Sequence, residues 1–301
     1  MKSFIIFFLL PVLTHGQNVT ELNKDLENNI DSIMNQYFKK DAPGAALLVA
    51  KDGKILYKKA FGKADLELDV PMKSEMIFEI GSITKQFTAI AILKLLEQGK
   101  LTLEDDIRKY IPEYPSHEHN ITIHHLLNQT SGIKELLSIE DKNNLPSISY
   151  KPLELISIFK DQPLDFVPGS KWSYSNSNYS ILGYIIEIAS GMSYSKFMEE
   201  NIFKPAGMFN SMDGSNEKII KNRVRGYYRS RSGTFYNANF LHLSYPYASG
   251  SILSSAEDMF KWQQALNANT LIKQTTKGKP LLIIRSQEKN RTMAMDGHSM
   301  K

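Results

Sequence analysis

The segment from Phe78 to Lys100 constrains the fold more than any other part of the chain. It reads FEIGSITKQFTAIAILKLLEQGK, and its apolar residues fall on all sides of the helix that this pattern predicts, up to Gly99. A helix that is apolar all round is buried at the centre of a domain. Ser82 and Lys85 stand three residues apart at its start, so they share one face.

A lysine at the start of a buried helix must reach water or be held by partners, because burying an unpaired ammonium costs free energy. Burial also lowers the pKa of a lysine, and a neutral amine can take a proton from a hydroxyl group. Ser82 and Lys85 are therefore a candidate nucleophile and base. Ser-x-x-Lys also occurs by chance, and a capping serine followed by a surface lysine would give the same pattern.

Composition narrows the function classes. The chain has 301 residues, 42% hydrophobic and 23% charged, which is typical of a globular protein of one large domain or two lobes. A net charge of +4 with scattered basic residues gives no support for nucleic-acid binding. The chain has no cysteine, so disulfides cannot hold it. His124 and His125 are adjacent and face different ways on a helix, so they are poor metal ligands. We expect no metal and no cofactor.

Residues 1–17 predict a secretory signal peptide. Lys2 precedes an apolar run from Phe4 to Leu13, and small residues follow near Gly16. The run is too short to span a bilayer as a helix. We expect cleavage near Gly16 or Gln17 and a periplasmic or secreted protein that is not held in the membrane after cleavage.

The remaining chain, 18–301, predicts one domain of the α/β class (α+β type). A helix over 18–40 is followed by two strands, Ala45–Ala50 and Ile55–Phe61, around the turn at 51–54. Strands early and helices in the middle predict an antiparallel sheet flanked by helices, with a helical insertion lobe.

Local signals fix the ends of several middle helices. Thr122 is a predicted N-cap and Gly191 a predicted C-cap. A capping box is expected from Ser254 to Glu257. The helix before Gly191 is expected to bury one face, formed by Ile181, Leu182, Ile185 and Ile188.

A second candidate motif is WSYSNSNY, residues 172–179. Tyr174 and Asn176 are two apart, so they point the same way in extended backbone. A tyrosine beside cations can lose its proton near neutral pH and act as a base, and an asparagine can hydrogen-bond a lysine and a substrate. By itself the motif also fits a structural tyrosine in a polar loop.

The two motifs together resemble the serine hydrolases related to class C β-lactamases and D-alanyl-D-alanine carboxypeptidases, which include penicillin-binding-protein-like enzymes. The resemblance covers about 43–266 and extends to the blocks IFEIGSITKQFTA, LTLEDDIRKYIPEYP, ITIHHLLNQTSGI, PGSKWSYSNSNYSILGYIIEIASGMSY, NIFKPAGM and ASGSILSSAEDMFKW, in family order. The resemblance implies a β-lactamase/transpeptidase-like fold. It implies that Ser82 is acylated, that Lys85 and Tyr174 share the acid and base work, and that Asn176 orients Lys85 and the substrate. The order of proton transfer between Lys85 and Tyr174 stays open.

Residues 273–301 depart from the family. Its third motif, a Lys-Thr-Gly or His-x-Gly triad on a strand, is matched only superficially by Gly297-His298-Ser299, because Met300 replaces the glycine. Back-translating Thr292–Gly297 with assumed codons and shifting the frame gives Tyr-Gly-Tyr-Gly-Trp, which family members often carry before that motif. We therefore hypothesise a frame shift after about Ile272, which the nucleotide sequence tests. We expect the chain, lacking the last strands and helix, to be poorly stable and weakly active.

The sequence thus predicts an exported serine hydrolase that cleaves an ester, amide or β-lactam bond through an acyl-enzyme on Ser82. Its expected partners are small-molecule or peptide substrates, with peptidoglycan as one candidate. The alternative from another class is a catalytically inactive relative that binds peptidoglycan or another partner. A fluorescent penicillin or fluorophosphonate label separates the two.

Overall fold

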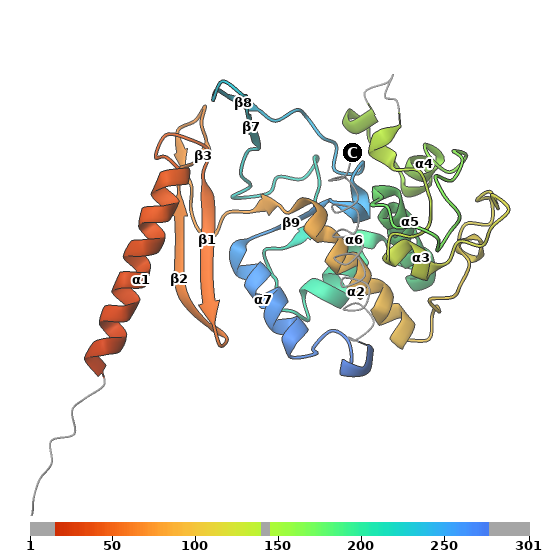
Figure 1. Ribbon diagram of the computed structural model, residues 1–301, viewed down its shortest axis with the longest axis horizontal. Helices are drawn as coiled ribbons and strands as arrows, with labels where there is room; N and C mark the ends of the chain where they lie inside the picture. The colour runs from red at the N-terminus through yellow and green to blue at the C-terminus, as the bar shows by residue number, and fades with distance from the viewer. Residues whose placement is uncertain (1–15, 140–144, 277–301) are drawn as a thin grey trace, which may run out of the picture. The chain divides into compact units, whose positions relative to one another are not determined.

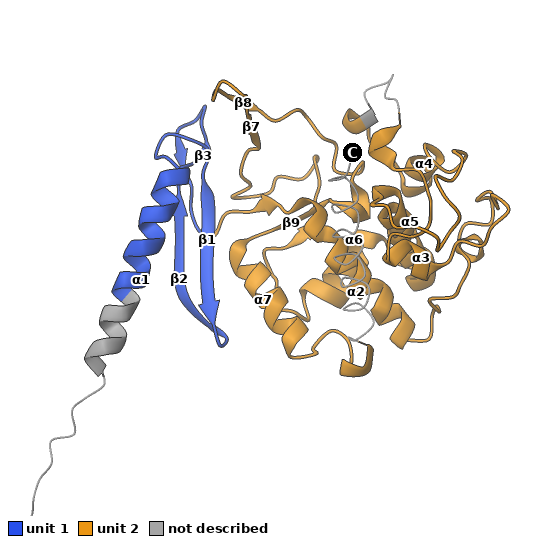
Figure 2. Ribbon diagram, viewed as in Figure 1, with its two compact units in different colours: residues 1–74 blue, residues 75–301 orange. Residues whose placement is uncertain are grey.

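The computed structural model describes the backbone of residues 16–139 and 145–276 (Figure 1). Most of the predicted signal peptide, the tail after residue 276 and the Gly297–Ser299 motif lie outside the described residues. The chain divides into two compact units, residues 1–74 and 75–301 (Figure 2), and each is described by itself.

The first unit is a helix with two small antiparallel sheets. Its elements are α1 (Gly16–Tyr37), β1 (Ala45–Lys51), β2 (Lys54–Phe61), β3 (Lys63–Asp65) and β4 (Val70–Pro71). β1 pairs with β2, and β3 with β4. Asp52 and Gly53 link β1 to β2 with φ of 51° and 75°, as a tight hairpin turn requires. The predicted hairpin is confirmed. Asp31 on α1 accepts hydrogen bonds from Tyr57 and Lys59 on β2.

The second unit is mainly helical. Its α-helices are α2 (Thr84–Glu97), α3 (Ile123–Leu127), α4 (Pro152–Ser157), α5 (Asn176–Ser190), α6 (Tyr194–Met198) and α7 (Ala256–Asn267). Its short 3₁₀ and π turns are η1 (Gly81–Ile83), η2 (Ile107–Lys109), η3 (Leu136–Ser138), η4 (Leu145–Ser147), η5 (Glu199–Phe203) and η6 (Tyr247–Ser249). Its strands are β5 (Phe78–Glu79), β6 (Met212–Asp213), β7 (Tyr227–Arg229), β8 (Phe235–Asn237) and β9 (Ile252–Ser254). β9 lies between β5 and β6 in one antiparallel sheet, and β7 pairs with β8 in another.

The core of this unit forms around α2 and α5, which pack against each other. The side chains that are fully buried at 0% exposure include Phe87, Ile92, Leu93 and Leu95 on α2 and Ile181, Leu182, Ile185 and Ile186 on α5. The prediction that the helix after Ser82 is a buried central helix is confirmed for most of its surface, but Gln86 is exposed and Ala89 and Lys94 are only partly buried. The predicted fold class is confirmed as well, with the described strands divided among four antiparallel sheets.

Some local predictions hold and others are wrong. Thr122 caps α3 by accepting from the His125 backbone N–H, and Gly191 ends α5 with a φ of 72°. The N-cap of α7 is Ser255, which accepts from Asp258 N–H, because Ser254 is part of β9. Ile188 is 49% exposed and lies off the buried face of α5, in the last turn of the helix.

In the portion of the chain that the structure describes, we find no helix whose length and apolar character would allow it to cross a membrane.

Candidate active site

Four polar side chains converge in the second unit at the start of α2 and the start of α5. Ser82 lies in η1 and Lys85 one turn later in α2, while Asn176 is the first residue of α5 and Tyr174 precedes it. Ser82 Oγ lies 2.7 Å from Tyr174 Oη and 3.2 Å from Lys85 Nζ. All the residues predicted for the site therefore lie in one cluster, although 92 positions separate Ser82 from Tyr174.

Three oxygen atoms surround the amine of Lys85. Its Nζ donates to Ser82 Oγ at 3.2 Å, to Asn176 Oδ1 at 2.8 Å and to the carbonyl oxygen of Ser249 at 2.8 Å. The rings of Tyr174 and Tyr179 lie 4.8 and 5.5 Å from Nζ. Lys85 is only 8% exposed. Burial lowers the pKa of Lys85 to about 8, and the negative charge of Glu135 partly opposes this shift.

The phenol of Tyr174 behaves differently from the sequence expectation. Burial raises the pKa of Tyr174 above its usual value, the hydrogen bond with Ser82 opposes this, and the charge of Glu135 adds to it. The positive charge of Lys85 is therefore not the main influence on the pKa of Tyr174. Tyr174 is therefore expected to keep its proton at neutral pH, which favours the acid role among the two roles that the motifs left open.

The loop around Gln129 supports the backbone between Tyr174 and Asn176. Gln129 is buried, and its Oε1 accepts from Ser175 N–H at 3.1 Å and from Asn178 Nδ2 at 2.6 Å. Ser131 Oγ donates to Asn178 Oδ1 at 2.6 Å. This loop positions the start of α5 through its hydrogen bonds to Ser175 and Asn178.

Two further groups, which the sequence motifs did not identify, contact the cluster. The Ser249 carbonyl, at the end of η6, accepts from Lys85, and Glu135 accepts from both N–H groups of Asn176. A backbone carbonyl has no residue-type signature, and a glutamate in a loop resembles any surface acid. A search for acids near the family blocks could have proposed Glu135, but only the fold shows what it contacts.

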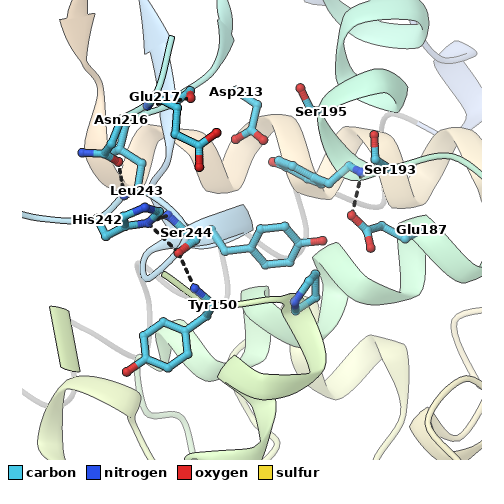
Figure 3. A pocket seen from close by; sticks show the side chains of 15 residues that line it. Tyr150, Glu187, Ser193, Ser195, Asp213, Asn216, Glu217, His242, Leu243 and Ser244 are labelled. Carbon is cyan, nitrogen blue, oxygen red and sulfur yellow. Dashed lines mark hydrogen bonds between the residues drawn. The ribbon is translucent and has the colours of Figure 1, made fainter. Parts of the chain in front are cut away.

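A separate acidic cavity of about 260 Å³ lies in the same unit (Figure 3). Asp213, Glu187 and Glu217 line it with Tyr194 and Tyr247, and the four clustered residues do not. Burial raises the pKa of Asp213 to about 6, its hydrogen bond from Ser251 opposes the shift, and the charge of Glu187 adds to it.

Comparison with known proteins finds relatives that are similar in sequence and in fold. Penicillin-binding protein 4* of Bacillus subtilis is 33% identical over 245 residues, covering 77% of this chain and 54% of that protein. The octameric penicillin-binding protein homologue from Pyrococcus abyssi has a TM-score of 0.70 at 32% identity, covering 85% of this chain and 59% of that one. The D-amino acid amidase from Ochrobactrum anthropi, solved with D-phenylalanine, has a TM-score of 0.74 at 25% identity, covering 84% and 74%.

The chain spans about half the length of the curated relatives it matches. Over its own length the match is extensive, since residues 23–293 fit the Beta-lactamase family, a range that includes much of the 273–301 tail expected to depart from it. The family match, the relatives and the fold agree, and the chain therefore belongs to the β-lactamase family.

Proposed function

We propose that this protein is an exported serine hydrolase that transfers an acyl group from an ester, amide or β-lactam to water through Ser82. Members of the β-lactamase family are serine hydrolases. A penicillin-binding protein and a D-amino acid amidase among the similar proteins favour small acyl donors and peptides, with peptidoglycan as one candidate.

The observation that carries this proposal is the set of partners around Lys85 Nζ. An ammonium has three hydrogens, and here each has an oxygen acceptor. The Ser249 carbonyl and Asn176 Oδ1 can only accept, so they keep two hydrogens when the amine loses a proton. The lone pair of the neutral amine then faces Ser82 Oγ, the one partner that also carries a hydrogen. The arrangement therefore directs the base at the nucleophile.

The reaction follows from these positions. Lys85 takes the proton of Ser82, whose Oγ bonds to the carbonyl carbon of the substrate. Tyr174, whose raised pKa keeps it protonated, lies in hydrogen-bond contact with Oγ and gives its single proton to the leaving group as the scissile bond breaks. The proton held by Lys85 restores the phenol. Water repeats the sequence on the acyl-enzyme, releases the acid and returns Ser82 to its starting state.

Covalent labelling tests the proposal. A fluorophosphonate or fluorescent penicillin is expected to label the 301-residue protein, and Ser82→Ala is expected to abolish the label. Ser173→Ala is the matched control, because Ser173 is an exposed serine in the loop that carries Tyr174 and should leave labelling unchanged. A folded parent protein that takes neither label would refute the proposal, as would labelling that survives in Ser82→Ala.

Export rests on the sequence of residues 1–17 and has its own test. Expression in a secreting host, followed by mass spectrometry of the released protein, is expected to show cleavage near Gly16 or Gln17. Retention of the first residues in a protein that stays inside the cell would contradict it.

A further inference from the structure

Glu135 makes more contacts with the cluster than a loop glutamate needs for its local role. It is the N-cap of η3, where its side chain accepts from Leu137 N–H at 3.3 Å. Two shorter contacts go to Asn176: the backbone N–H donates to Oε2, and the side-chain Nδ2 donates to Oε1 at 2.5 Å. One carboxylate thus holds both the backbone and the side chain of Asn176, 41 positions away in the sequence.

These contacts set the direction in which the Asn176 amide points. Its Nδ2 faces the Glu135 carboxylate, and its Oδ1 accepts from Lys85 Nζ at 2.8 Å. In the reversed orientation the NH₂ group would face an ammonium and the oxygen would face a carboxylate, which removes two charge-assisted hydrogen bonds at once. Two opposite charges at the two ends of the amide therefore fix one orientation.

We propose that Glu135 is a positioning residue. By accepting from the backbone N–H and from the side-chain NH₂ of Asn176, it points the amide oxygen at Lys85. Lys85 then keeps its lone pair directed at Ser82. The inference rests on the proposed function of Ser82 and Lys85. One hydrogen of the Asn176 NH₂ group goes to Glu135 and the other remains for a substrate carbonyl. Glu135 itself needs no contact with the substrate.

The charge of Glu135 adds a measurable signature. Around Lys85 Nζ lie Ser82, Asn176, the Ser249 carbonyl and the rings of Tyr174 and Tyr179, and Glu135 is the charged group that raises the Lys85 pKa against burial. The same charge raises the pKa of Tyr174. Neutralising Glu135 is therefore expected to lower both pKa values through the loss of its charge, whereas the Asn176 amide signals report the hydrogen bonds that position the amide.

Three substitutions separate position from charge. Glu135→Gln keeps the shape but presents an NH₂ group to one of the two Asn176 donors, so one donor loses its acceptor. Glu135→Asp keeps the charge on a shorter side chain. Asp165→Asn is the matched control. Asp165 forms an ion pair at 2.9 Å with Lys134, the residue that precedes Glu135 in the sequence. The substitution removes one negative charge from this region without changing a partner of Asn176.

The first measurement does not depend on activity. In ¹⁵N-labelled protein, the Asn176 backbone and side-chain amide protons are expected to be shifted downfield and slow to exchange in the parent and in Asp165→Asn, and to lose both properties in Glu135→Gln. Titration of ¹³Cε-labelled lysine is expected to show a lower Lys85 pKa in Glu135→Gln alone. Unchanged amide signals together with an unchanged Lys85 titration would overturn the proposal.

The second measurement is the rate of Ser82 labelling as a function of pH. Glu135→Gln is expected to slow labelling by about 10- to 100-fold, in line with the loss of a hydrogen bond to a charged group, and to move its acidic limb to lower pH. Glu135→Asp should label faster than Glu135→Gln, and the acidic limb of its pH–rate profile should lie at the same pH as in the parent. A parent protein that takes no label defeats the proposed function, whereas the amide signals still decide the role of Glu135. If Glu135→Gln is labelled at the parental rate and with the parental pH–rate profile, the positioning role is refuted.

Discussion

At the residue scale, the state of each titrating group follows from what surrounds it. Lys85 and Tyr174 both lie against Ser82, yet burial moves their pKa values in opposite directions because it disfavours the charged form of each. Lysine approaches neutrality and tyrosine stays protonated. These opposite shifts support the proposed order of proton transfer, in which Lys85 is the first acceptor.

The pH dependence of Ser82 labelling should report this order. Because the Lys85 pKa is lowered to about 8 and only the neutral amine accepts a proton, the labelling rate should rise with pH and level off above about 8. Lys85→Arg should stay slow throughout this range, since a guanidinium keeps its proton. Lys94→Gln, on the same helix but bonded to the Asn201 carbonyl, should keep the parental profile. A rate that does not vary between pH 6 and 9 would contradict Lys85 as the base.

Asp213 makes a prediction about stability. Its pKa of about 6 in the folded chain exceeds the value of 3.8 expected when unfolded, so the folded state holds its proton more tightly. Stability from this group is therefore present at low pH and is lost as pH rises from about 4 to about 6. Asp213→Asn should be more stable than the parent at pH 8, by about 1–3 kcal/mol, with a smaller difference at pH 4.

Thermal or urea unfolding of both proteins at the two pH values checks the Asp213 prediction. Glu217→Gln is the control, because Glu217 lines the same cavity but is exposed, and its substitution should alter stability little at either pH. An Asp213→Asn protein less stable than the parent at pH 8 would show that the ionised carboxylate is favoured in the fold.

At the element scale, the packing of α5 against η6 connects the core to the site. Gly183 on α5 leaves no room for a side chain, because an added Cβ would lie 2.4 Å from Ala248 Cβ and 2.6 Å from Tyr247 Cε1. The next residue along η6 is Ser249, whose carbonyl holds Lys85. The glycine thus allows η6 to come close enough to place this acceptor.

Gly183→Ala should therefore disturb both stability and chemistry. Overpacking at this contact is expected to cost about 1–3 kcal/mol of unfolding free energy, and a shift of η6 should also slow Ser82 labelling. Ile188→Ala on the same helix is the control, since Ile188 is 49% exposed and should change stability by about 0.5 kcal/mol or less. Denaturant unfolding and label kinetics of the two variants provide the comparison, and a fully stable, fully reactive Gly183→Ala would contradict the packing argument.

The elements also show what the sequence could and could not predict. Ser82, Lys85, Tyr174 and Asn176 were identified because each carries a reactive group at a fixed spacing within a motif. Glu135 and the Ser249 carbonyl were missed because their roles depend on folding distant loops against α2 and α5. The predicted N-cap of α7 is one residue from the observed one. Ser254 and Ser255 are both of a residue type that can cap a helix, and only the extent of β9 decides between them.

At the scale of the whole molecule, burial is distributed unevenly over the described residues. α2 and α5 carry side chains with no exposure, whereas the strand residues of β1 are only partly buried and most of those of β2 are exposed. β1 and β2 form a two-stranded sheet, an arrangement that is marginally stable by itself. Local stability is therefore expected to be high in the helical core and low in this hairpin.

Hydrogen exchange on the full chain measures that distribution. Backbone amides of α2 and α5 should exchange only through global unfolding, and those of β1 and β2 should exchange orders of magnitude faster. Adding denaturant below the unfolding midpoint should accelerate amide exchange in the helices and leave the exchange rates of the hairpin nearly unchanged. Equal protection of the hairpin and the helices would show that β1 and β2 belong to the same cooperative unit as the core.

The enclosure of Lys85 has a consequence for preparative chemistry. Reductive methylation, often applied to lysines to improve crystals, needs an accessible amine that can meet formaldehyde. Most lysines whose exposure the structure describes can do so. Lys85 is 8% exposed and its nitrogen already has three oxygen partners, whereas the neighbouring Ser82 is exposed. Exhaustively methylated protein should therefore retain one primary amine in α2, and a serine-directed reagent should still find its target.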